Sequence, residues 1–580
     1  MAKIWQPTEK LPEAVITANP KYSPILLQLL FNRGIQKPEE VEAFFIEEFG
    51  LDEYLKRYDP FLFKDMEEAV NLIIGCVKAS QKIMIYGDYD ADGVTATAVL
   101  WDTLKILGAK VDYYLPDRVT EGYGLNKEAI AKIAADDYKL VITVDTGTRN
   151  WEEIEYAKSL GLKVVLTDHH ALPENPTEIP QCLLINCANQ GDAYPFKTLA
   201  GVGVAFKVIQ ALVSRSKLNE EQKQYLMERS LDLVALGTVS DMVSLLGENR
   251  LLVKKGLEVL NQTKRLGLKE LINVAKLGNN ATKLDSWNIG FQLGPRLNAA
   301  SRLGHANNAL ELILSNDSDE VKRLANELNQ KNIERQEITA NIMALVEKNI
   351  DPQNIPPIII SLCGLEYDTK TEGVIGLVAG RICEKYYRPT LVITRSQDGY
   401  KASGRSIEEF NLIAAIEDSR EFLDKYGGHP MACGFSVYER DRLDKFIVKI
   451  SSLAAAKLAG LELAPKLRLD AVLSPSDINS SLVEDISKLA PYGQNNPQPK
   501  FASYGLTVRE MVTMGGKGEH IKLRLTDGAS NLWAIAFFKN KEFTDIQIGS
   551  KVDVAYYLDL NNFNGKSEVQ MKIIDLVPTK

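Results

Sequence analysis

KIMIYGDYDADG, residues Lys82–Gly93, joins an alternating apolar run to three closely spaced carboxylates. The run over Lys82–Gly87 has the period of a β-strand, and Asp88, Asp90 and Asp92 follow at its carboxyl end. Open α/β sheets bind their ligands at this end of their strands. Three like charges so close together repel one another unless a cation neutralises them, which indicates a metal site.

Two simpler interpretations of this acidic loop are open at this point. The pattern D-x-D-x-D-G also begins calcium-binding loops, but these need a glutamate at the twelfth position, where this chain has Val99. A solvated acidic turn without function is the second alternative. Residues further along the chain have to decide between them.

The composition is that of a large globular protein. At 580 residues the chain is too long for one hydrophobic core, so we expect several domains. No apolar run is long enough to span a membrane, and the start lacks a signal peptide, so we expect a cytoplasmic protein. The six scattered cysteines predict reduced, buried thiols. The net charge of −9 argues against a broadly basic surface but leaves room for nucleic acid in a local groove.

Short β-rich runs alternate with helix-like segments from about residue 61 onward. The predicted strands are Lys82–Gly87, Lys110–Leu115, Lys139–Val144, Leu162–Leu166 and Cys182–Asn186. The predicted helices between them are Val94–Leu107, Lys127–Ala135 and Trp151–Leu160. This alternation predicts right-handed crossovers and a parallel sheet, whose strand-end loops all open on one edge.

The remaining segments differ in their periodicity. Helical spacing is found in Ser23–Asn32, Pro38–Phe45, Ala200–Ser214, Glu220–Leu236 and Leu324–Lys348. A second α/β block has a strand, helix, strand and late helix at Pro357–Leu362, Val374–Tyr387, Thr390–Thr394 and Asp441–Leu458. Short strands then follow at Lys466–Leu473, Lys500–Thr513, His520–Thr526, Asn531–Phe537, Lys551–Leu558 and Val569–Leu576. The last group predicts a small closed barrel such as an OB-fold.

These segments predict an α/β multidomain protein. We expect an N-terminal helical segment, a parallel-sheet domain, a helical connector, a second α/β domain and a C-terminal β-barrel. Their predicted boundaries are 1–60, 61–245, 246–350, 351–460 and 465–580.

Further metal-ligand side chains follow two later strands of the predicted sheet. Asp145 comes after the third strand, and Asp168, His169 and His170 come at the end of the fourth. Asp241 ends an apolar helix-like run. Because neighbouring parallel strands end at one edge, we expect these groups to converge there. Carboxylates with imidazole and no thiolate select Mn²⁺ or Mg²⁺, and two ions could share a bridging aspartate.

The four short motifs GDYDADG, VDTGT, TDHH and VSD, in this order, resemble those of the DHH phosphoesterase superfamily. Five later motifs make the chain similar to the RecJ-type exonucleases of that superfamily: GPRLNAASRLG (294–304), EGVIGLVAGRICEKYYRPTLVIT (372–394), ASGRS (402–406), KYGGHPMACGF (425–435) and LAPYGQNNPQPKF (489–501). The resemblance implies that 61–245 is a DHH catalytic domain, 351–460 a DHHA1 domain and 465–580 an OB-fold domain that binds nucleic acid.

The resemblance also implies an activity. It is that of a single-stranded-DNA-specific 5′→3′ exonuclease, a metal-dependent hydrolase that releases 5′-mononucleotides in DNA repair and recombination. The resemblance implies two divalent cations, with Mn²⁺ expected in preference to Mg²⁺. Their ligands would be Asp88, Asp90, Asp92, Asp145, His169 and Asp241. Asp145 would bridge the ions, and which of Asp88 and Asp90 binds directly is open. His170 would face the scissile phosphate, and Asp168 would orient the imidazoles.

Contacts to DNA and to a 5′-phosphate are implied for Arg118, Tyr123, Arg296, Ser403, Arg405, Gly427, Gly428 and His429. Ser403 and Arg405 suit a terminal phosphate, and His429 would bind the phosphate oxygens as they gain charge. Each of these groups has a structural alternative. A single arginine is often a surface ion-pair partner, Tyr123 could be a buried structural residue, and Gly427–His429 could be a helix C-cap followed by a turn.

In the predicted barrel, basic residues interleave with aromatic ones, which suggests a surface that follows the strand. The basic residues are Lys500, Lys517, Lys522, Arg524, Lys566 and Lys572, and the aromatic ones are Phe501, Trp533, Phe538 and Phe563. About half of these aromatics are expected in the barrel core. The resemblance implies a single-strand-binding protein and a RecQ-type helicase as partners. We expect the enzyme to be a monomer.

Two rival functions are open. One is a DHH phosphodiesterase that acts on short oligonucleotides, cyclic dinucleotides or a 3′-phosphonucleotide, although such chains are generally shorter and lack the barrel. The other is an inactive scaffold associated with a helicase, although degenerate relatives lose metal ligands and this chain has them all.

Overall fold

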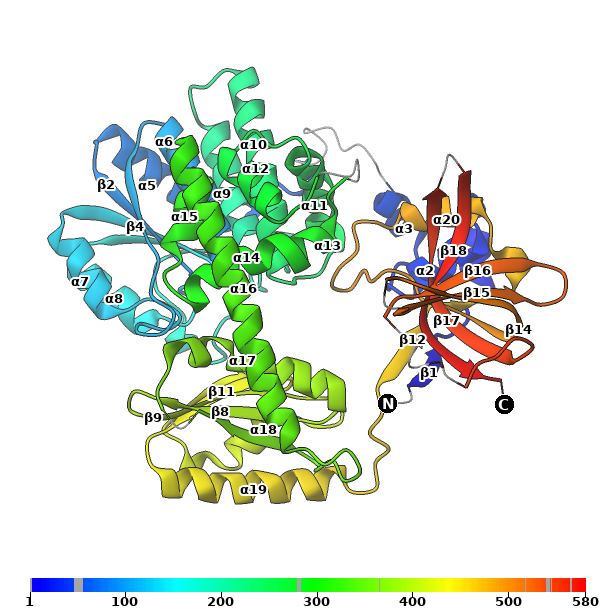
Figure 1. The fold of residues 1–580 in the computed structure, drawn as a ribbon. Coiled ribbons are helices and arrows are strands. Elements are labelled where there is room, and N and C mark those ends of the chain that lie inside the picture. Colours follow the sequence, from blue (N-terminus) through cyan, green and yellow to red (C-terminus); the bar gives the residue numbers. More distant parts are fainter. Residues whose placement is uncertain are drawn as a thin grey trace. The chain divides into compact units, whose positions relative to one another are not determined.

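The computed structural model of the chain describes residues 3–45, 56–278, 283–364, 366–516, 518–538, 543, 545–563 and 566–579. Within these ranges the chain forms two compact units (Figure 1). One unit holds Leu51–Leu463, and the other combines Met1–Gly50 with Ala464–Lys580. No helix in the described ranges is long and apolar enough to cross a membrane.

The first sheet of the larger unit is parallel throughout, with the strand order β3-β2-β4-β5-β6. Its strands are β2 (Lys82–Gly87), β3 (Lys110–Tyr114), β4 (Tyr138–Val144), β5 (Lys163–Asp168) and β6 (Leu183–Asn186). The predicted parallel sheet is therefore confirmed. Its strands β2, β4 and β5 are neighbours, so the three loops that carry the predicted ligands open side by side.

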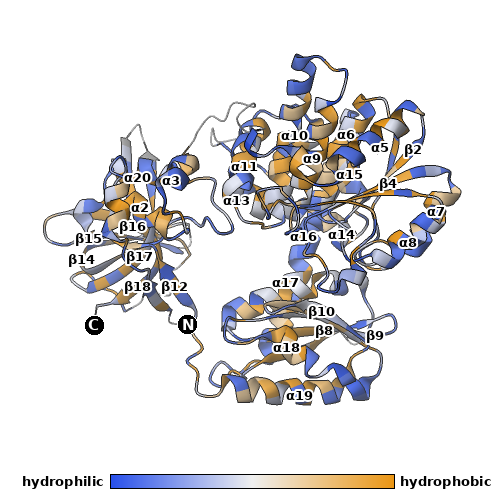
Figure 2. Ribbon diagram, turned by 180° about the vertical axis from the view of Figure 1, so that it is seen from behind, coloured by the Kyte–Doolittle hydropathy of each residue, from blue (hydrophilic) through white to orange (hydrophobic). Residues whose placement is uncertain are grey.

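Helices cover both faces of this sheet (Figure 1). The first of them are η1 (Pro60–Leu62), α5 (Met66–Lys78), α6 (Ala91–Ile106), α7 (Lys127–Ala135), α8 (Trp151–Ser159), η2 (Pro176–Glu178), α9 (Gly201–Ser214) and α10 (Glu220–Ser240). Helices α7 and α8 share one core with the sheet, whereas α6, α9 and α10 pack together. Figure 2 shows α9 as strongly hydrophobic, in keeping with its burial from Gly201 to Val213.

A helical region follows, as predicted. Its elements are α11 (Gly247–Leu260), α12 (Leu266–Val274), α13 (Ser286–Asn288), the π-helix η3 (Ile289–Leu293), α14 (Gly294–Arg302), α15 (Asn307–Leu314) and α16 (Ser318–Lys348). The predicted helix at Leu324–Lys348 is confirmed but begins earlier, because Asp317 accepts hydrogen bonds from the backbone N–H groups of Asp319 and Glu320. Ile342 and Val346 of α16 are part of the core of the next sheet.

The second sheet is mixed, with the strand order β10-β11-β9-β8-β7. Its strands are β7 (Ile359–Cys363), β8 (Thr390–Ser396), β9 (Gly399–Arg405), β10 (Lys425–His429) and β11 (Ala432–Val437). Its helices are α17 (Thr369–Tyr386), α18 (Leu412–Glu417), η4 (Arg420–Phe422) and α19 (Arg440–Leu458). The alternative interpretation of Gly427–His429 as a helix C-cap and turn is wrong, because these residues lie in the exposed edge strand β10.

The smaller unit contains a closed barrel. Strand β14 pairs with both β15 and β17, which closes the order β14-β15-β16-β18-β17. The strands of this unit are β1 (Ile4–Pro7), β12 (Lys466–Leu469), β13 (Ala471–Val472), β14 (Phe501–Met514), β15 (His520–Thr526), β16 (Asn531–Ala536), β17 (Lys551–Phe563) and β18 (Lys566–Pro578). The predicted C-terminal β-barrel is confirmed.

The N-terminal segment packs on this barrel. Its helices are α1 (Glu13–Ala18), α2 (Pro24–Phe31) and α3 (Pro38–Phe45), and the barrel segment adds η5 (Pro475–Asp477) and α20 (Ser480–Ser487). Strand β1 pairs with β12, and Trp5 Nε1 donates a hydrogen bond of 2.8 Å to Asp575 Oδ2. Arg33 Nε donates a hydrogen bond of 2.6 Å to Asn496 Oδ1. Contacts between the two ends of the chain thus hold this unit together.

Candidate metal centre

Acids and imidazoles from three neighbouring strand ends meet at one edge of the parallel sheet. Their candidate ligand atoms lie within 4.8 Å of one another in overlapping groups: Asp88 with Asp90 and Asp145; Asp92 with His169 and Asp241; Asp145 with Asp168, His169 and His170. Asp241 arrives at this edge from the end of α10. The structure therefore brings together every acid and histidine that the four short motifs singled out.

Four buried atoms of this cluster have no hydrogen-bond partner. They are Asp88 Oδ1, Asp145 Oδ1, His169 Nε2 and Asp241 Oδ2. His169 Nε2 lies 3.1 Å from Asp145 Oδ1 and 3.6 Å from Asp241 Oδ2, without the geometry of a hydrogen bond. Buried polar atoms are rarely left unpaired, and oxygen and imidazole donors that face each other at this distance fit a divalent cation.

The pKa values of the acids show how much negative charge the cluster holds. Burial, followed by the charge of neighbouring carboxylates, raises the pKa of Asp88 and Asp145 well above the ordinary value. The same causes raise the pKa of Asp92 to about 7 and that of Asp241 to about 9. Burial lowers the pKa of His169 to about 4, so its imidazole is neutral and able to bind a metal. His169 therefore adds no positive charge that would offset the carboxylates.

Local backbone geometry holds the acids in place. Asp90 caps α6 by accepting the N–H groups of Asp92 and Gly93, at 2.8 and 3.1 Å. Asp92 in turn accepts the N–H groups of Gly201 and Val202 at the start of α9, at 2.7 and 3.0 Å. Asp145 has the left-handed φ of 61°, which is strained for a residue other than glycine and is often found at functional sites.

Gly201 is a site residue that the sequence analysis missed. A Cβ at this position would lie 2.5 Å from Asp145 Oδ1, so a side chain here would displace the carboxylate. The stretch AGVGVAF, which holds Gly201, gave only an ordinary helical signal. Its two glycines were the available clue to a close approach of the backbone.

Asp168 is used differently from the other acids. Its Oδ1 accepts the backbone N–H groups of His169 and His170 at 2.7 and 3.2 Å and lies 2.8 Å from His170 Nδ1. Its Oδ2 accepts the N–H of Thr148 at 3.0 Å. Burial raises the pKa of Asp168, but the hydrogen bond and charge of His170 outweigh it and hold the pKa below its ordinary value. Both oxygens are engaged, which fits an orienting role better than that of a ligand.

Tyr123 lies beside His170, as its Oη is 3.1 Å from His170 Nδ1 and donates a hydrogen bond of 3.3 Å to the carbonyl oxygen of Asp145. Its side chain is 49% exposed, so the alternative of a buried structural tyrosine is wrong. The ring is thus available to a ligand at the edge of the cluster.

A cavity of about 210 Å³ opens over the carboxylates. Its lining residues are Asp88, Tyr89, Asp90, Arg118, Tyr123, Asp145, His170, Asp241, Asn298 and Arg302. Arg118 lies over the ring of Tyr89, with 4.8 Å from its guanidinium carbon to the ring centroid. Carboxylates and guanidinium groups that line one cavity suit a phosphate that bridges cations and arginines.

Arg302 was also missed, since the sequence analysis chose the other arginine of GPRLNAASR. Arg302 Nη1 donates a hydrogen bond of 2.9 Å to the carbonyl oxygen of Gly373, and its buried Nε has no partner. Burial, with the charge of Arg118 next, lowers the pKa of Arg302 to about 9. Arg296 does not line the cavity and instead donates a hydrogen bond of 3.0 Å to Asn329 Oδ1.

The other predicted DNA contacts lie in the second sheet. Ser403 and Arg405 are on β9, and Gly427, Gly428 and His429 are on β10, with β11 between them. Ser403 and Arg405 lie under α17, where a Cβ on Gly376 would be 3.0 Å from Ser403 Oγ and 3.6 Å from Arg405 Nη2. The structure groups these residues with one another. None of them lines the described cavity of the acids.

The barrel residues singled out by the sequence have different surroundings. Phe501 is buried in the core, and Phe538 is exposed. Lys522 and Arg524 lie over Trp533, with 4.2 and 5.7 Å to its ring centroid, and Lys572 pairs with Asp559. Lys517 and the side chains of Phe563 and Lys566 lie outside the described residues.

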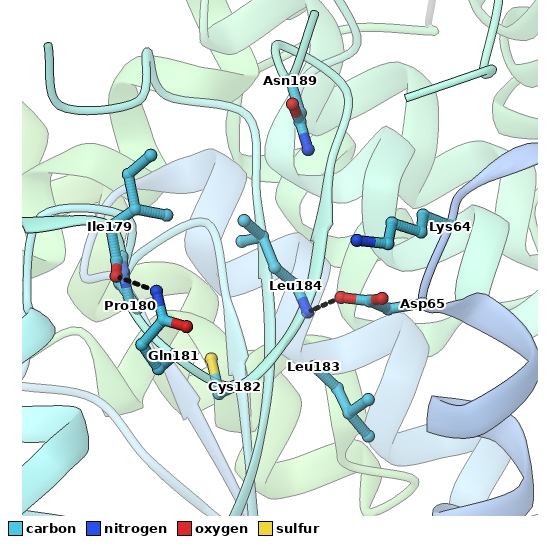
Figure 3. Close-up of a pocket in the computed structure, with 9 residues that line it drawn as sticks. All are labelled: Lys64, Asp65, Ile179, Pro180, Gln181, Cys182, Leu183, Leu184 and Asn189. Atoms are coloured by element: carbon cyan, nitrogen blue, oxygen red, sulfur yellow. Dashed lines mark hydrogen bonds between the residues drawn. The ribbon is translucent and has the colours of Figure 1, made fainter. Parts of the chain in front are cut away.

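A larger cavity, of about 510 Å³, opens beside the edge strand β6 (Figure 3). Its described lining contains one carboxylate, Asp65, whose Oδ2 accepts the N–H of Leu184 at 2.9 Å. This cavity lacks the set of ligands found over the acids, so its size does not make it the metal centre.

Comparisons with known protein families find domains in the same order along the chain as the parallel sheet, the mixed sheet and the barrel. Residues 82–238 match the DHH family, N-terminal domain, residues 357–456 match the DHHA1 domain and residues 469–575 match the RecJ OB domain. The single-stranded-DNA-specific exonuclease RecJ of Bacillus subtilis is 35% identical over 95% of this chain and 68% of its own length. That of Escherichia coli is 32% identical over 96% of each chain.

The chain belongs to the RecJ family of single-stranded-DNA-specific exonucleases. A RecJ structure extends the match to three dimensions: RecJ of Thermus thermophilus in complex with Mn²⁺ has a TM-score of 0.82 at 28% identity, covering 100% of this chain and 80% of that one. A structure of the same relative in complex with Mg²⁺ has a TM-score of 0.76.

Proposed function

We propose that this RecJ-family chain degrades single-stranded DNA from the 5′ end and releases 5′-mononucleotides. The observation that carries the proposal is the set of four unpaired, buried ligand atoms at the ends of neighbouring strands and of α10. The names of the relatives support single-stranded DNA as substrate. The Mn²⁺ and Mg²⁺ complexes of the Thermus relative support a divalent cation as cofactor.

We assign two cations to the cluster. Asp92, His169 and Asp241 would hold one, and Asp88, Asp90 and Asp145 the other, which follows the grouping of their ligand atoms. Asp145 is the proposed bridge, because its Oδ1 lies 3.1 Å from His169 Nε2 and its ligand atoms also fall in the group of Asp88. Bound divalent cations supply a water of lowered pKa and offset negative charge on phosphate oxygens.

The remaining side chains orient the phosphate. Asp168 fixes the ring of His170 through Nδ1, and although burial lowers the pKa of His170, that hydrogen bond and the charge of Asp168 raise it above its ordinary value. His170 lines the cavity, so its proton is available to a phosphate oxygen that gains charge. Arg118 and Arg302 reach the same cavity and would bind the phosphates on either side.

Contacts further along the DNA are assigned to the second sheet and the barrel. Ser403, Arg405 and the exposed Gly427–His429 would bind the 5′-phosphate end, supported by their proximity within one sheet. A catalytic part for His429 rests on the resemblance alone. The proposed domain boundaries and cytoplasmic location rest on the periodicity and composition of the sequence. The monomeric state is likewise an expectation, and the partners, a single-strand-binding protein and a RecQ-type helicase, are supported by the resemblance alone.

The test uses a long single strand with a 5′-phosphate and a 3′ label, in Mn²⁺ and after chelation. We expect stepwise release of 5′-mononucleotides in Mn²⁺, none after chelation and none from a blunt duplex of the same sequence. Cleavage in the interior of the strand, or release from the 3′ end, would contradict the proposal. Turnover of dinucleotides alone would favour the short-substrate phosphodiesterase, and cation binding without turnover of any of these substrates would favour the inactive scaffold.

A further inference from the structure

Two exposed aromatic side chains precede the cavity-lining Asn298 by eleven and seven residues. Trp287 is 55% and Phe291 69% exposed, and their rings stack with 5.5 Å between centroids and 27° between planes. Neither residue belongs to the motifs that define the cluster of acids. Such an exposed pair of large apolar rings generally has a binding role.

The backbone that carries this pair is unusual. Phe291 lies in the π-helix η3, and π-helices are rare and often occur at functional sites. η3 packs against the end of α10, where a Cβ on Gly290 would lie 3.8 Å from Val239 Cγ1. A Cβ on Gly294 would lie 2.4 Å from Ser240 Oγ, one residue before Asp241. The pair is thus fixed to the element that delivers a candidate metal ligand.

One face of the helix leads from the pair into the cavity. Phe291, Pro295, Asn298 and Arg302 follow one another at intervals of four, three and four residues, the spacing of a single helical face. Asn298 and Arg302 line the cavity over the acids. At about 1.5 Å per residue, Phe291 lies roughly 10 Å along the axis from Asn298, a distance of one to three nucleotides of a single strand.

We propose that Trp287 and Phe291 form a stacking platform for the unpaired bases next to the nucleotide that is cleaved. This inference rests on the proposed function, because it needs a single strand in the cavity. Every base presents a π-face, so aromatic stacking holds a strand without regard to its sequence. Bases in a duplex are already stacked on their neighbours, so the platform also favours single-stranded over double-stranded substrate.

The test compares the double variant Trp287→Ala/Phe291→Ala with the wild-type protein. We expect the KM for a long single strand to rise roughly tenfold or more, with kcat changed by less than about threefold, because stacking contributes to binding rather than to the chemical step. Tyr225→Ala is the matched control. Tyr225 is 54% exposed on the same helix as Asp241 but lies sixteen residues earlier, and its removal should leave KM unchanged.

Substrates without bases separate stacking from other causes. On a strand whose first nucleotides after the 5′ end are abasic, the wild type should show the raised KM and the double variant should show no further increase. Trp287→Phe/Phe291→Tyr should restore the wild-type KM, whereas Trp287→Leu/Phe291→Leu, which keeps the apolar surface, should not. The melting temperatures of the leucine pair and the wild type are compared to detect unfolding.

An unchanged KM in the double variant would overturn the platform, as would an equally large rise on abasic and normal strands. Full rescue by the leucine pair would indicate an apolar surface for another part of the protein instead. If the wild type itself releases no nucleotides from single strands, the proposed function fails. If it does and the variants match it, only the platform fails.

Discussion

The two sheets of the larger unit present their predicted functional residues in opposite ways. At the parallel sheet, Asp88, Asp92 and Asp145 are buried at adjacent strand ends, and the cluster that they form with His169 and Asp241 leaves four ligand atoms unpaired. In the mixed sheet, Gly427–His429 lie on an exposed edge strand. The first arrangement is built before any ligand arrives and concentrates negative charge. The second offers backbone and side chains to a partner from solvent, which suits gripping a substrate rather than transforming it.

The largest expected effect is at the buried cluster. Asp145→Asn should lower the Mn²⁺-dependent rate on the order of a thousandfold or more, since it removes charge from the proposed bridge between two cations. Asparagine tolerates the left-handed backbone of this position better than alanine, so the fold should be kept. Rates on a labelled single strand, with circular dichroism as the control, check this. A rate near that of the wild type would remove Asp145 from the centre.

Arg302 tests the link between the two sheets, because it lines the cavity and bonds to Gly373 of α17. Arg302→Ala should lower kcat/KM by roughly ten- to a hundredfold, the loss expected for a charge-assisted hydrogen bond to phosphate. Arg296→Ala on the same helix is the control, since Arg296 contacts Asn329 instead, and it should change kcat/KM by less than threefold or so. Equal losses in both variants would speak against a specific role of Arg302.

The mixed sheet is tested at Arg405. Arg405→Ala should reduce the preference for a 5′-phosphate over a 5′-hydroxyl end by roughly tenfold, while the Mn²⁺ concentration for half-maximal rate stays the same. Competition between the two kinds of end in one reaction measures this preference. A preference equal to that of the wild type would take Arg405 out of the proposed phosphate site, and a shifted Mn²⁺ requirement would tie the mixed sheet to the metal centre.

The smallest expected effect is a pH-dependent stabilisation by the cation. Without it, Asp92 and Asp241 have pKa values of about 7 and 9 through burial and neighbouring carboxylates. These raised values favour folding below the ordinary pKa of about 4, and the benefit is lost as the pH rises through 7 and 9. Bound Mn²⁺ replaces the protons, so it should raise the melting temperature by a few degrees more at pH 8 than at pH 5.

Thermal melts at both pH values, with and without Mn²⁺, check this expectation. Asp145→Asn supplies the matched control, because a cluster with less negative charge should gain less from the ion. An equal gain at the two pH values would contradict the account of the cluster as an uncompensated negative site.

The sequence predicted those parts of the molecule whose signals are local. Alternation of apolar residues gave β2 over Lys82–Gly87 with its bounds, and acids placed directly after strands marked the loops that converge. The helical pattern at Leu324–Lys348 gave α16 but not its start, because the cap at Asp317 lies outside the apolar period. For Tyr123 the sequence left a DNA contact and a buried structural residue open, since a single aromatic carries no information on its surroundings, and the structure excludes the buried alternative.

By itself, the chain's sequence determined the strands of the parallel sheet and of the barrel and which acids follow them, since these depend on neighbours a few residues apart. It did not give β9, β10 and β11 of the mixed sheet. Only the tertiary structure decided that Gly201 leaves room for Asp145, that Arg302 rather than Arg296 enters the cavity, and that β1 joins the barrel. The physical reason is that such contacts depend on how elements distant in the chain pack against one another. The apolar periodicity of a segment does not show which side chain of another segment will pack against a given residue.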